Sequence, residues 1–498
     1  MSAVPGIRIQ RCNEAAVRPD GRYVLYWMIA NRRLRYNFAL DRAMEHCKIL
    51  GKPLVIFEAL RVGYRWASDR THKFLLDGMG VNQQVCNDHA VRYLAYVELN
   101  PGDGKGLLKA LAEEACIVVT DDFPCFFLPH MVESAAKQRK VLLEAVDSNG
   151  LLPLRATDHA FQRALDFRRY LQKELPKHLQ HFPAADPLNR LKERAAPRIS
   201  SKIFEKWPMA SGEVLRGNPR ALAAMPIDHT VEPVEICGGT EASRFRLKEF
   251  FDRGFERYGE HRSEPEADAS SGFSPYLHFG HLSVHEVFTE LGKKEKWTLE
   301  RLSLQANGNK VGWWNMSATA ESFLDELITW RELGFNFAAH RKDYGCYEAL
   351  PEWAKGTLRN HKRDEREHVY GLEEFEHART HDSLWNATQR QLVREGRIQN
   401  YLRMLWGKKI LEWSRSPEEA AEIMIHLNNK YALDGRDPNS YSGIFWVFGR
   451  YDRPWAPERP IFGTVRYMSS ENTARKFRVK RYIEKYSKSG VEQGPTSF

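Results

Sequence analysis

The sequence lacks the features that mark membrane-spanning and secreted proteins. Its 498 residues contain no apolar run of about 18 residues, which a transmembrane helix requires. The N-terminal stretch Met1–Val17 lacks the basic and then apolar order of a secretory signal. The seven cysteines are scattered and form neither a disulfide framework nor a CxxC metal pair. We therefore expect a reduced, intracellular protein, cytoplasmic or, in a eukaryote, nuclear.

The chain also lacks a strong excess of charge of either sign. Lys and Arg number 74 against 65 Asp and Glu, which gives a net charge of +9. This modest basic excess permits contacts with nucleic-acid phosphates but does not establish them. Aromatic residues, by contrast, are plentiful: they make up 12% of the chain and include 13 tryptophans. We therefore expect flat aromatic rings to have a role in this protein.

The N-terminal third alternates short apolar runs with amphipathic segments. Helical patterns occupy Arg35–Leu50 and the region around Met131–Gln138. Four runs are typical of buried strands: Tyr23–Met28, Pro53–Leu60, Cys116–Asp122 and Lys140–Asp147. Continuous Val, Ile and Leu runs joined by helices predict a Rossmann-like parallel sheet with helices on both faces.

The rest of the chain divides into a proline-rich stretch and a helical region. Prolines recur among charged and small residues between 183 and 238, which predicts an interdomain linker. From residue 239 onward the apolar residues follow a helical period. We therefore expect an α/β domain at residues 1–182, a linker at 183–238 and an all-α domain at 239–498.

Two short motifs have an ordinary explanation that we prefer to a functional one. Pro101–Gly106 (PGDGKG) follows a strand-like run but fits neither GxxxxGK[ST] nor GxGxxG, so we interpret it as a surface turn. His377 and His381 have the spacing of a zinc-binding helix, but no Glu follows the first His and no third ligand is evident. We expect no metal site, and we interpret His381–Ser383 as the end of a loop that caps the helix from Leu384.

A serine-rich turn leaves a structural and a functional interpretation open. Ser270, Ser271 and Ser274 lead into a helix expected after Pro275. Free backbone N–H groups and the helix dipole attract anions at such a position, although the serines could also serve only as helix caps. Tyr258, just upstream, could stack or hydrogen-bond beside a ligand there.

Two acidic segments also leave a structural and a functional interpretation open. Glu326 and Trp330 lie four residues apart on one predicted helical face, where a carboxylate and a ring could contact a base, or could form an ordinary amphipathic surface. Asp434 and Asp437 could serve in acid–base chemistry, but no nucleophile or second base stands at a suggestive spacing. Their segment is equally typical of a turn.

Taken together, these segments resemble the class II cyclobutane pyrimidine dimer photolyases of the cryptochrome/photolyase family. Several long motifs occur in family order between Tyr258 and Met468: SPYLHFG, ELITWREL, THDSLWNATQRQLVREGR, LRMLWGKKILEW, LDGRDPNSYSGIFW and ERPIFGTVRYM. The resemblance implies the photolyase fold, with an α/β domain that can hold an antenna pigment of deazaflavin or folate type and an all-α domain that binds FAD. It also implies that UV-damaged DNA is the partner and that its pyrimidine dimer is flipped out and split by an electron from photoexcited reduced FAD. We expect a monomer that does not act at a membrane.

The resemblance assigns the flavin contacts residue by residue. The three serines match the phosphate-binding turn, and Asn428 matches the asparagine that faces the flavin N5. Arg403 is similar to an arginine paired with Asp434 at the isoalloxazine edge, where a cation would stabilise an anionic flavin. The full cofactor-binding set is Tyr258, Ser270, Ser271, Ser274, Arg403, Asn428 and Asp434.

The dimer pocket follows in the same way, with some departures from the family pattern. The residues that match its lining are Glu326, Trp330, Met404 and Trp446. Trp330 stands where many class II members carry Arg. Gly272 and Phe273 stand where members tend to have Asn and Leu. Ile29–Tyr36 (IANRRLRY) also departs from the family pattern, so no antenna residues are assigned.

Three tryptophans could serve either in core packing or in electron transfer. Trp406 and Trp413 lie on nearly the same face of one predicted helix, roughly 10 Å apart at about 1.5 Å per residue. This spacing fits both core packing and electron hopping. The resemblance favours hopping, because it implies a triad that runs from Trp406, nearest the flavin, through Trp385 to Trp413, the outermost. With Glu326 and Asn428, these three tryptophans are the predicted catalytic residues.

The same fold permits a second function, a cryptochrome-like light sensor without repair activity. Such sensors often carry a longer tail, whereas little chain follows Met468. The presence of Glu326 also favours repair. A third possibility, a DNA-binding protein without flavin, is disfavoured by Asn428, Asp434 and the serine turn.

Overall fold

The computed structural model describes residues 4–89, 91–137, 140–191 and 197–487. They form two compact units, each built from several chain segments. The first contains the chain up to Asp158, Lys173–Phe251 and Gly272–Arg301; the second contains His159–Gln172, Asp252–Ser271 and the chain from Leu302 onward. Both units are discontinuous in sequence, and the boundaries expected at residues 182 and 238 stay predictions about folding domains.

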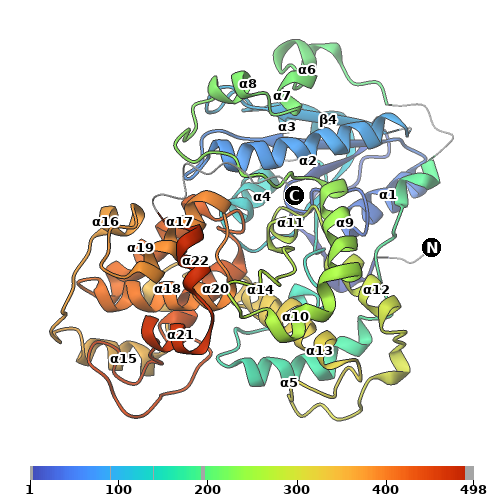
Figure 1. Cartoon of the computed structure of the whole chain (residues 1–498). Coiled ribbons are helices and arrows are strands. Elements are labelled where there is room, and N and C mark those ends of the chain that lie inside the picture. Colours follow the sequence, from blue (N-terminus) through green and yellow to red (C-terminus); the bar gives the residue numbers. More distant parts are fainter. Residues whose placement is uncertain (1–3, 90, 138–139, 192–196, 488–498) are drawn as a thin grey trace. The chain divides into compact units, whose positions relative to one another are not determined.

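A six-stranded sheet of order β1-β6-β5-β2-β3-β4 forms the centre of the first unit (Figure 1). β1 pairs antiparallel with β6, and all other neighbours are parallel. The strands are β1 (Ile9–Arg11), β2 (Tyr23–Met28), β3 (Leu54–Leu60), β4 (Arg92–Val97), β5 (Ala115–Asp121) and β6 (Leu143–Val146). The four strands expected from apolar runs are confirmed as β2, β3, β5 and β6. β4 corresponds to the strand-like run before Pro101, and β1 was not predicted.

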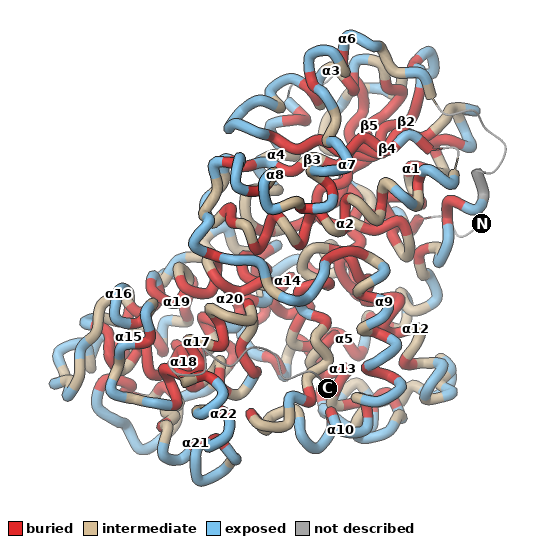
Figure 2. Tube along the Cα trace, turned by 45° about the horizontal axis from the view of Figure 1, so that its top comes forward, coloured by how far each residue is buried: buried red, intermediate tan, exposed pale blue. Residues whose placement is uncertain are grey.

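The helices α1, α2 and α3 pack against strands of this sheet. The helices of the first unit are α1 (Phe38–Leu50), α2 (Asp69–Asn87), α3 (Leu107–Glu114), α4 (Leu128–Lys137), α6 (Ser201–Lys206), α7 (Gly212–Leu215), α8 (Pro219–Ala223), α9 (Thr240–Glu249), α11 (Ser274–His278) and α12 (Val284–Lys294). The expected helices at Arg35–Leu50 and Met131–Gln138 correspond to α1 and α4, although Gln138 lies outside the described residues. Every residue of β2 and β5 is buried, which Figure 2 shows as a continuous red interior. The predicted α/β fold is confirmed.

The proline-rich stretch does more than connect. It carries α6, α7 and α8, and four of its side chains belong to the core of the first unit: Leu188, Leu215, Leu222 and Met225. Pro101–Gly106 forms a surface turn before α3, as predicted.

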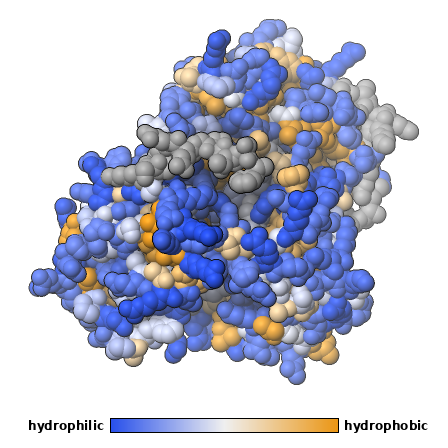
Figure 3. All heavy atoms as spheres, viewed as in Figure 1, coloured by the Kyte–Doolittle hydropathy of each residue, from blue (hydrophilic) through white to orange (hydrophobic). Residues whose placement is uncertain are grey.

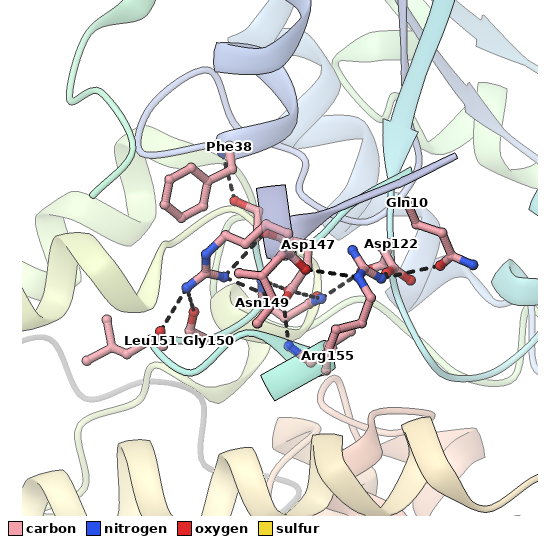
Figure 4. A network of polar contacts seen from close by, with 12 residues as sticks. Gln10, Phe38, Asp122, Asp147, Asn149, Gly150, Leu151 and Arg155 are labelled. Atoms are coloured by element: carbon pink, nitrogen blue, oxygen red, sulfur yellow. Dashed lines mark hydrogen bonds and ion pairs between the residues drawn. The ribbon is translucent and has the colours of Figure 1, made fainter. Parts of the chain in front are cut away.

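A buried polar network fixes the chain where it leaves β6. Arg8 is 1% exposed and donates to the carbonyls of Gly150 at 3.1 Å and Leu151 at 2.8 Å. Its guanidinium also lies 4.5 Å from the ring centroid of Phe38. Asp147, whose carboxylate accepts from neighbouring loop N–H groups, sits at the centre of the group in Figure 4. These contacts hold the loop after β6 in a single arrangement.

The second unit is helical. Its helices are α5 (Ala164–Glu174, all but its last two residues), α10 (Phe255–His261), α13 (Ala318–Leu324), α14 (Arg331–His340), α15 (Glu352–Asn360), α16 (Leu372–Glu376), α17 (Ser383–Glu395), α18 (Asn400–Trp413), α19 (Pro417–Tyr431), α20 (Pro438–Val447), α21 (Ser470–Lys476) and α22 (Lys480–Lys485). Every strand that the structure describes belongs to the first unit, so the all-α part of the predicted fold is confirmed. A π-helical segment, Asp325–Trp330, lies between α13 and α14.

The lengths of the apolar helices, the state of the cysteines and the polarity of the surface can be read from the structure. No helix among the described residues is long and apolar enough to cross a membrane. All seven cysteines are free. The face shown in Figure 3 is mostly hydrophilic, and its hydrophobic side chains form small separate groups.

Candidate functional site

An ion pair links Arg262, the residue that follows α10, to the π-helical segment of the second unit. Arg262 Nη1 lies 2.6 Å from Glu326 Oε1, and both side chains are about one-third exposed. Arg262 Nη1 also donates to the hydroxyl of Tyr258 at 3.4 Å. Burial lowers the pKa of Arg262, but attraction to Glu326 outweighs this and raises it overall. Burial, with a smaller contribution from Glu326, raises the pKa of Tyr258 to about 12.

Arg262 was not among the predicted site residues. A sequence signal for it exists, because an Arg four residues after Tyr258 falls on the same face of a helix. Its partner Glu326 lies 64 positions further along the chain, and no sequence pattern joins them. Glu326 and Trp330 also belong to a π-helix instead of the expected α-helix, and such segments occur often at functional sites.

A second polar group surrounds Asp434. Arg403 Nη2 donates to both carboxylate oxygens of Asp434, at 3.2 and 3.3 Å. Ser440 Oγ donates to the backbone carbonyl of Asp434 at 2.7 Å and accepts from Asn428 Nδ2 at 3.2 Å. Asn428 is 4% exposed. Three of the seven predicted flavin-binding residues, Arg403, Asn428 and Asp434, are thus joined in one hydrogen-bonded group.

Asp437 has a structural role that agrees with the turn interpretation. Its carboxylate accepts from the N–H of Asn439 at 2.8 Å and caps α20. Asp382 likewise caps α17 by accepting from the N–H of Trp385 at 2.9 Å, which agrees with a cap at His381–Ser383.

The serine turn differs in detail from the expectation. α11 begins at Ser274 itself, not after Pro275, and its five residues give it only a small dipole. The N-cap residue Phe273 makes no side-chain cap bond. Gly272 has a φ of 72°, a left-handed conformation that Gly and Asn adopt readily. Gly and the Asn expected from the resemblance therefore both suit this backbone conformation.

Two of the residues expected to line a dimer pocket are partly exposed. Trp330 meets Tyr451 edge-to-face, with ring centroids 6.5 Å apart. Met404 is half-buried on α18, one residue after Arg403.

Two basic side chains lie near the ring of Trp446, the remaining residue expected to line the dimer pocket. The Nζ of Lys408 lies 5.2 Å from its ring centroid, and the guanidinium of Arg466 lies 5.7 Å away. Lys408 is 1% exposed and donates to the carbonyl of Val447 at 2.5 Å. Burial lowers the pKa of Lys408 to about 7.

The three tryptophans of the predicted electron-transfer chain are brought together. Trp385 Nε1 donates to the carbonyl of Trp406 at 3.0 Å, and the rings of Trp385 and Trp413 are 6.1 Å apart. Trp406 Nε1 donates to Gln389 Oε1 at 2.9 Å. All three are buried, at 3% exposure for Trp406, 0% for Trp385 and 4% for Trp413. The rings therefore also contribute to the core of the second unit.

Trp413, the expected outermost ring, contacts more exposed aromatic residues. His381 lies 4.8 Å and Tyr370 5.8 Å from it, centroid to centroid. Tyr370 Oη and His381 Nδ1 are hydrogen-bonded at 2.9 Å. Burial and the nearby His368 lower the pKa of His381. Within the described residues, no group of three or more His, Cys, Asp or Glu could hold a metal ion.

In the first unit, the carboxylate of Asp121 occupies the point where the sheet order reverses between β2 and β5. It accepts from the N–H groups of Ile29 and Ala30 at 2.8 Å and of Asn31 at 3.0 Å, and from the hydroxyl of Tyr26 at 2.8 Å. α/β folds often place ligand phosphates on such N–H groups. Here the chain's own carboxylate satisfies them, so they do not fit an additional anionic ligand.

Known proteins share this fold and much of this sequence. No family model matches the chain. A deoxyribodipyrimidine photo-lyase from Methanothermobacter thermautotrophicus is 33% identical over 479 residues, which is 96% of this chain and 97% of that protein. Photo-lyases of the same name from Arabidopsis thaliana and Potorous tridactylus are each 32% identical, over 94% and 93% of this chain and 89% and 81% of their own lengths.

A solved structure supports the fold independently. A bacterial class III photolyase from Agrobacterium tumefaciens matches with a TM-score of 0.66 and 17% identity, over 94% of this chain and 86% of that one. The chain therefore has the photolyase fold. It belongs to the deoxyribodipyrimidine photo-lyase family. Membership of class II within this family stays a prediction.

Proposed function

We propose that this protein is a light-dependent enzyme that splits cyclobutane pyrimidine dimers in DNA. The observation that carries the proposal is its 33% identity, over nearly the full length of both chains, to a protein named for this lyase activity. Nothing in the sequence or the fold specifically favours the light-sensor alternative.

The hydrogen-bonded group around Asp434 suits one edge of FAD. Arg403 would supply positive charge beside the flavin ring, and Asp434 would fix the position of that guanidinium. The buried amide of Asn428 would meet the ring as a hydrogen-bonding partner. The resemblance gives Tyr258 and the serines at 270, 271 and 274 as the remaining FAD contacts. FAD, when bound, supplies the light-excited electron donor.

The Arg262–Glu326 pair suits the dimer. The Glu326 carboxylate can accept from the N–H edge of a pyrimidine, and Arg262 keeps that carboxylate in place. Trp330, Met404 and Trp446 would supply apolar and stacking surface around a base flipped out of the helix. The net charge of +9 would assist contacts with the DNA backbone. We expect the enzyme to act as a monomer.

An antenna chromophore of deazaflavin or folate type would, if present, need a place other than the N–H groups that Asp121 occupies. These N–H groups belong to Ile29–Asn31. The three residues lie in the segment that departs from the family pattern.

Light dependence gives a direct test. The purified protein is loaded with FAD, reduced, and mixed with a duplex oligonucleotide that holds one cyclobutane thymine dimer. We expect the intact thymines to reappear under blue or near-UV light and not in the dark. Flavin-loaded protein that leaves the dimer unchanged under light would refute the repair proposal and favour the light sensor.

A further inference from the structure

The segment Arg262–Asp268 joins two parts of the proposed site. It begins at Arg262, which pairs with Glu326 at 2.6 Å, and it ends just before Ser270, the first residue of the serine turn. The segment forms turns and irregular structure instead of a helix, and most of it is at least partly exposed. Such a segment has little stability of its own, so contacts from other elements must hold it in position.

Gln399 holds the beginning of this segment. Its Nε2 donates to the carbonyl of Arg262 at 2.7 Å, while its Oε1 accepts from the N–H of Leu402 at 3.0 Å and caps α18. The residue is 8% exposed. One buried amide therefore joins the backbone of Arg262 to the first turn of the helix that carries Arg403 and Trp406.

Arg397 holds the end of the segment. Its Nη1 and Nη2 donate to Asp268 Oδ1 and Oδ2, both at 2.7 Å, which is the bidentate geometry that favours Arg over Lys. Its Nε donates to Glu395 Oε2 at 3.0 Å, which orients the guanidinium. Asp268 has a φ of 41°, an uncommon conformation for a residue other than Gly. The ion pair helps to stabilise that conformation.

The C-terminal helix α22, with the residue that follows it, adds one contact to Glu395, the partner of Arg397, and one to the segment itself. The hydroxyl of Tyr486, which follows α22, donates to Glu395 Oε1 at 2.5 Å. The N–H of Arg481, inside α22, donates to Glu266 Oε1 at 2.8 Å. The segment is thus held by α22 and by the connection between α17 and α18, the two helices that carry the tryptophans.

We propose that Arg397 and Gln399 are positioning residues for this enzyme. Through the segment Arg262–Asp268 they hold Arg262 against Glu326 and set the start of the serine turn. The inference rests on the proposed function, which gives the ion pair to the dimer and the serines to FAD. Neither Arg397 nor Gln399 touches a ligand; both act through the backbone that they hold.

The substitution Gln399→Glu isolates one of these contacts. Glu has the same shape, still accepts from the N–H of Leu402, and as an anion suits a helix N-terminus. It cannot donate to the carbonyl of Arg262. We expect the affinity for a duplex oligonucleotide with one cyclobutane thymine dimer to fall about fivefold or more, because a carbonyl loses its partner. Affinity for the undamaged duplex should change little.

Gln172 provides a matched control. Its Oε1 accepts from the N–H of Gly308 at 2.7 Å and its Nε2 donates to the carbonyl of Asn309 at 2.9 Å, and it is 4% exposed. It therefore bonds in the same two-way manner as Gln399, away from the segment. Gln172→Glu should leave the affinity for dimer-containing DNA unchanged.

The effect of the substitution Arg397→Ala is measured as the affinity of the apoprotein for FAD. We expect this affinity to fall about two- to fivefold, as suits a partly exposed ion pair. Exchange of the charges, Arg397→Asp with Asp268→Arg, should restore only part of it, because Glu395 would then lie beside a second carboxylate. Arg341→Ala is the control, because Arg341 and Asp343 form a bidentate pair at 2.7 and 2.6 Å with a similarly exposed Arg, 34% against 35% for Arg397.

The outcomes separate this inference from the proposed function. Wild type that binds neither FAD nor dimer-containing DNA would refute the proposed function itself. Wild type that binds both, with Gln399→Glu and Arg397→Ala losing no more affinity than their controls, would overturn the positioning role. If Arg397→Ala fails to fold, Arg397→Lys replaces it, since Lys keeps the charge and loses the bidentate geometry.

Discussion

Replacement of Trp406 by Phe tests whether the buried tryptophans conduct electrons or only fill the core. We expect Trp406→Phe to block the photoreduction of oxidised FAD and to spare repair by enzyme that is reduced beforehand. The reason is geometric. Trp406 is the predicted first ring of the chain, and Trp385 and Trp413 follow it with ring centroids 6.1 Å apart. Electron hopping falls steeply with distance and needs an indole that can be oxidised, which Phe does not provide.

The cost in stability decides whether the experiment is possible. Trp406 is 3% exposed, and its Nε1 donates to Gln389 Oε1 at 2.9 Å. Loss of this donor leaves a buried acceptor without its partner, at about 1–3 kcal/mol. The smaller ring adds roughly 1 kcal/mol in lost apolar burial. Because domains are stable by about 5–15 kcal/mol, the variant should still fold.

The assay follows the oxidised flavin absorbance under illumination with an external reductant. Trp313→Phe is a matched control, because Trp313 is 4% exposed and lies against Trp314, outside the predicted chain. Photoreduction should proceed in wild type and in Trp313→Phe and should fail in Trp406→Phe. Thermal unfolding of all three proteins shows whether the two substitutions cost similar stability.

Two results would refute this reasoning. Unchanged photoreduction in Trp406→Phe would leave the tryptophans with a packing role only. Equal loss in Trp406→Phe and Trp313→Phe would trace the defect to stability instead of electron transfer.

Substitutions at three further positions test other residues of the second unit and of the serine turn. Glu326→Ala should lower the repair yield per photon about fivefold or more while FAD content holds, because the dimer loses a charged acceptor; loss of FAD instead would place Glu326 at the cofactor. Burial lowers the pKa of Lys408 to about 7, so between that pH and the unfolded value of about 10.4 the unfolded chain binds more protons and stability rises with pH. Lys408→Met should lack this rise. Equal slopes of unfolding free energy against pH in the wild type and in this variant would contradict the lowered pKa of Lys408. Gly272→Ala should destabilise by about 1 kcal/mol and Gly272→Asn by less, because only Asn tolerates the φ of 72°; equal unfolding midpoints would argue against backbone strain.

Much of the first unit could be predicted from its sequence. β2 and β5 are buried along their whole length, so their apolar runs are continuous and easily recognised. β1 is a three-residue edge strand, Ile9–Arg11, with polar residues and no such pattern. It is a strand only because the edge of β6 offers it hydrogen-bonding partners. β4, by contrast, is buried after its exposed first residue, Arg92, and matches the strand-like run before Pro101.

The sequence by itself determined the family through long motifs in family order, and the alternation of apolar runs and helices determined the two kinds of architecture. The spacing of Trp406 and Trp413 was compatible with two roles, and only the tertiary structure brought Trp385 to Trp413. The pairing of Arg262 with Glu326 also required the folded chain, since hydrogen bonds and ion pairs depend on three-dimensional distance and leave no periodic trace in sequence. The π-helical turn that carries Glu326 arises in the same way, from packing that overrides a local α-helical preference.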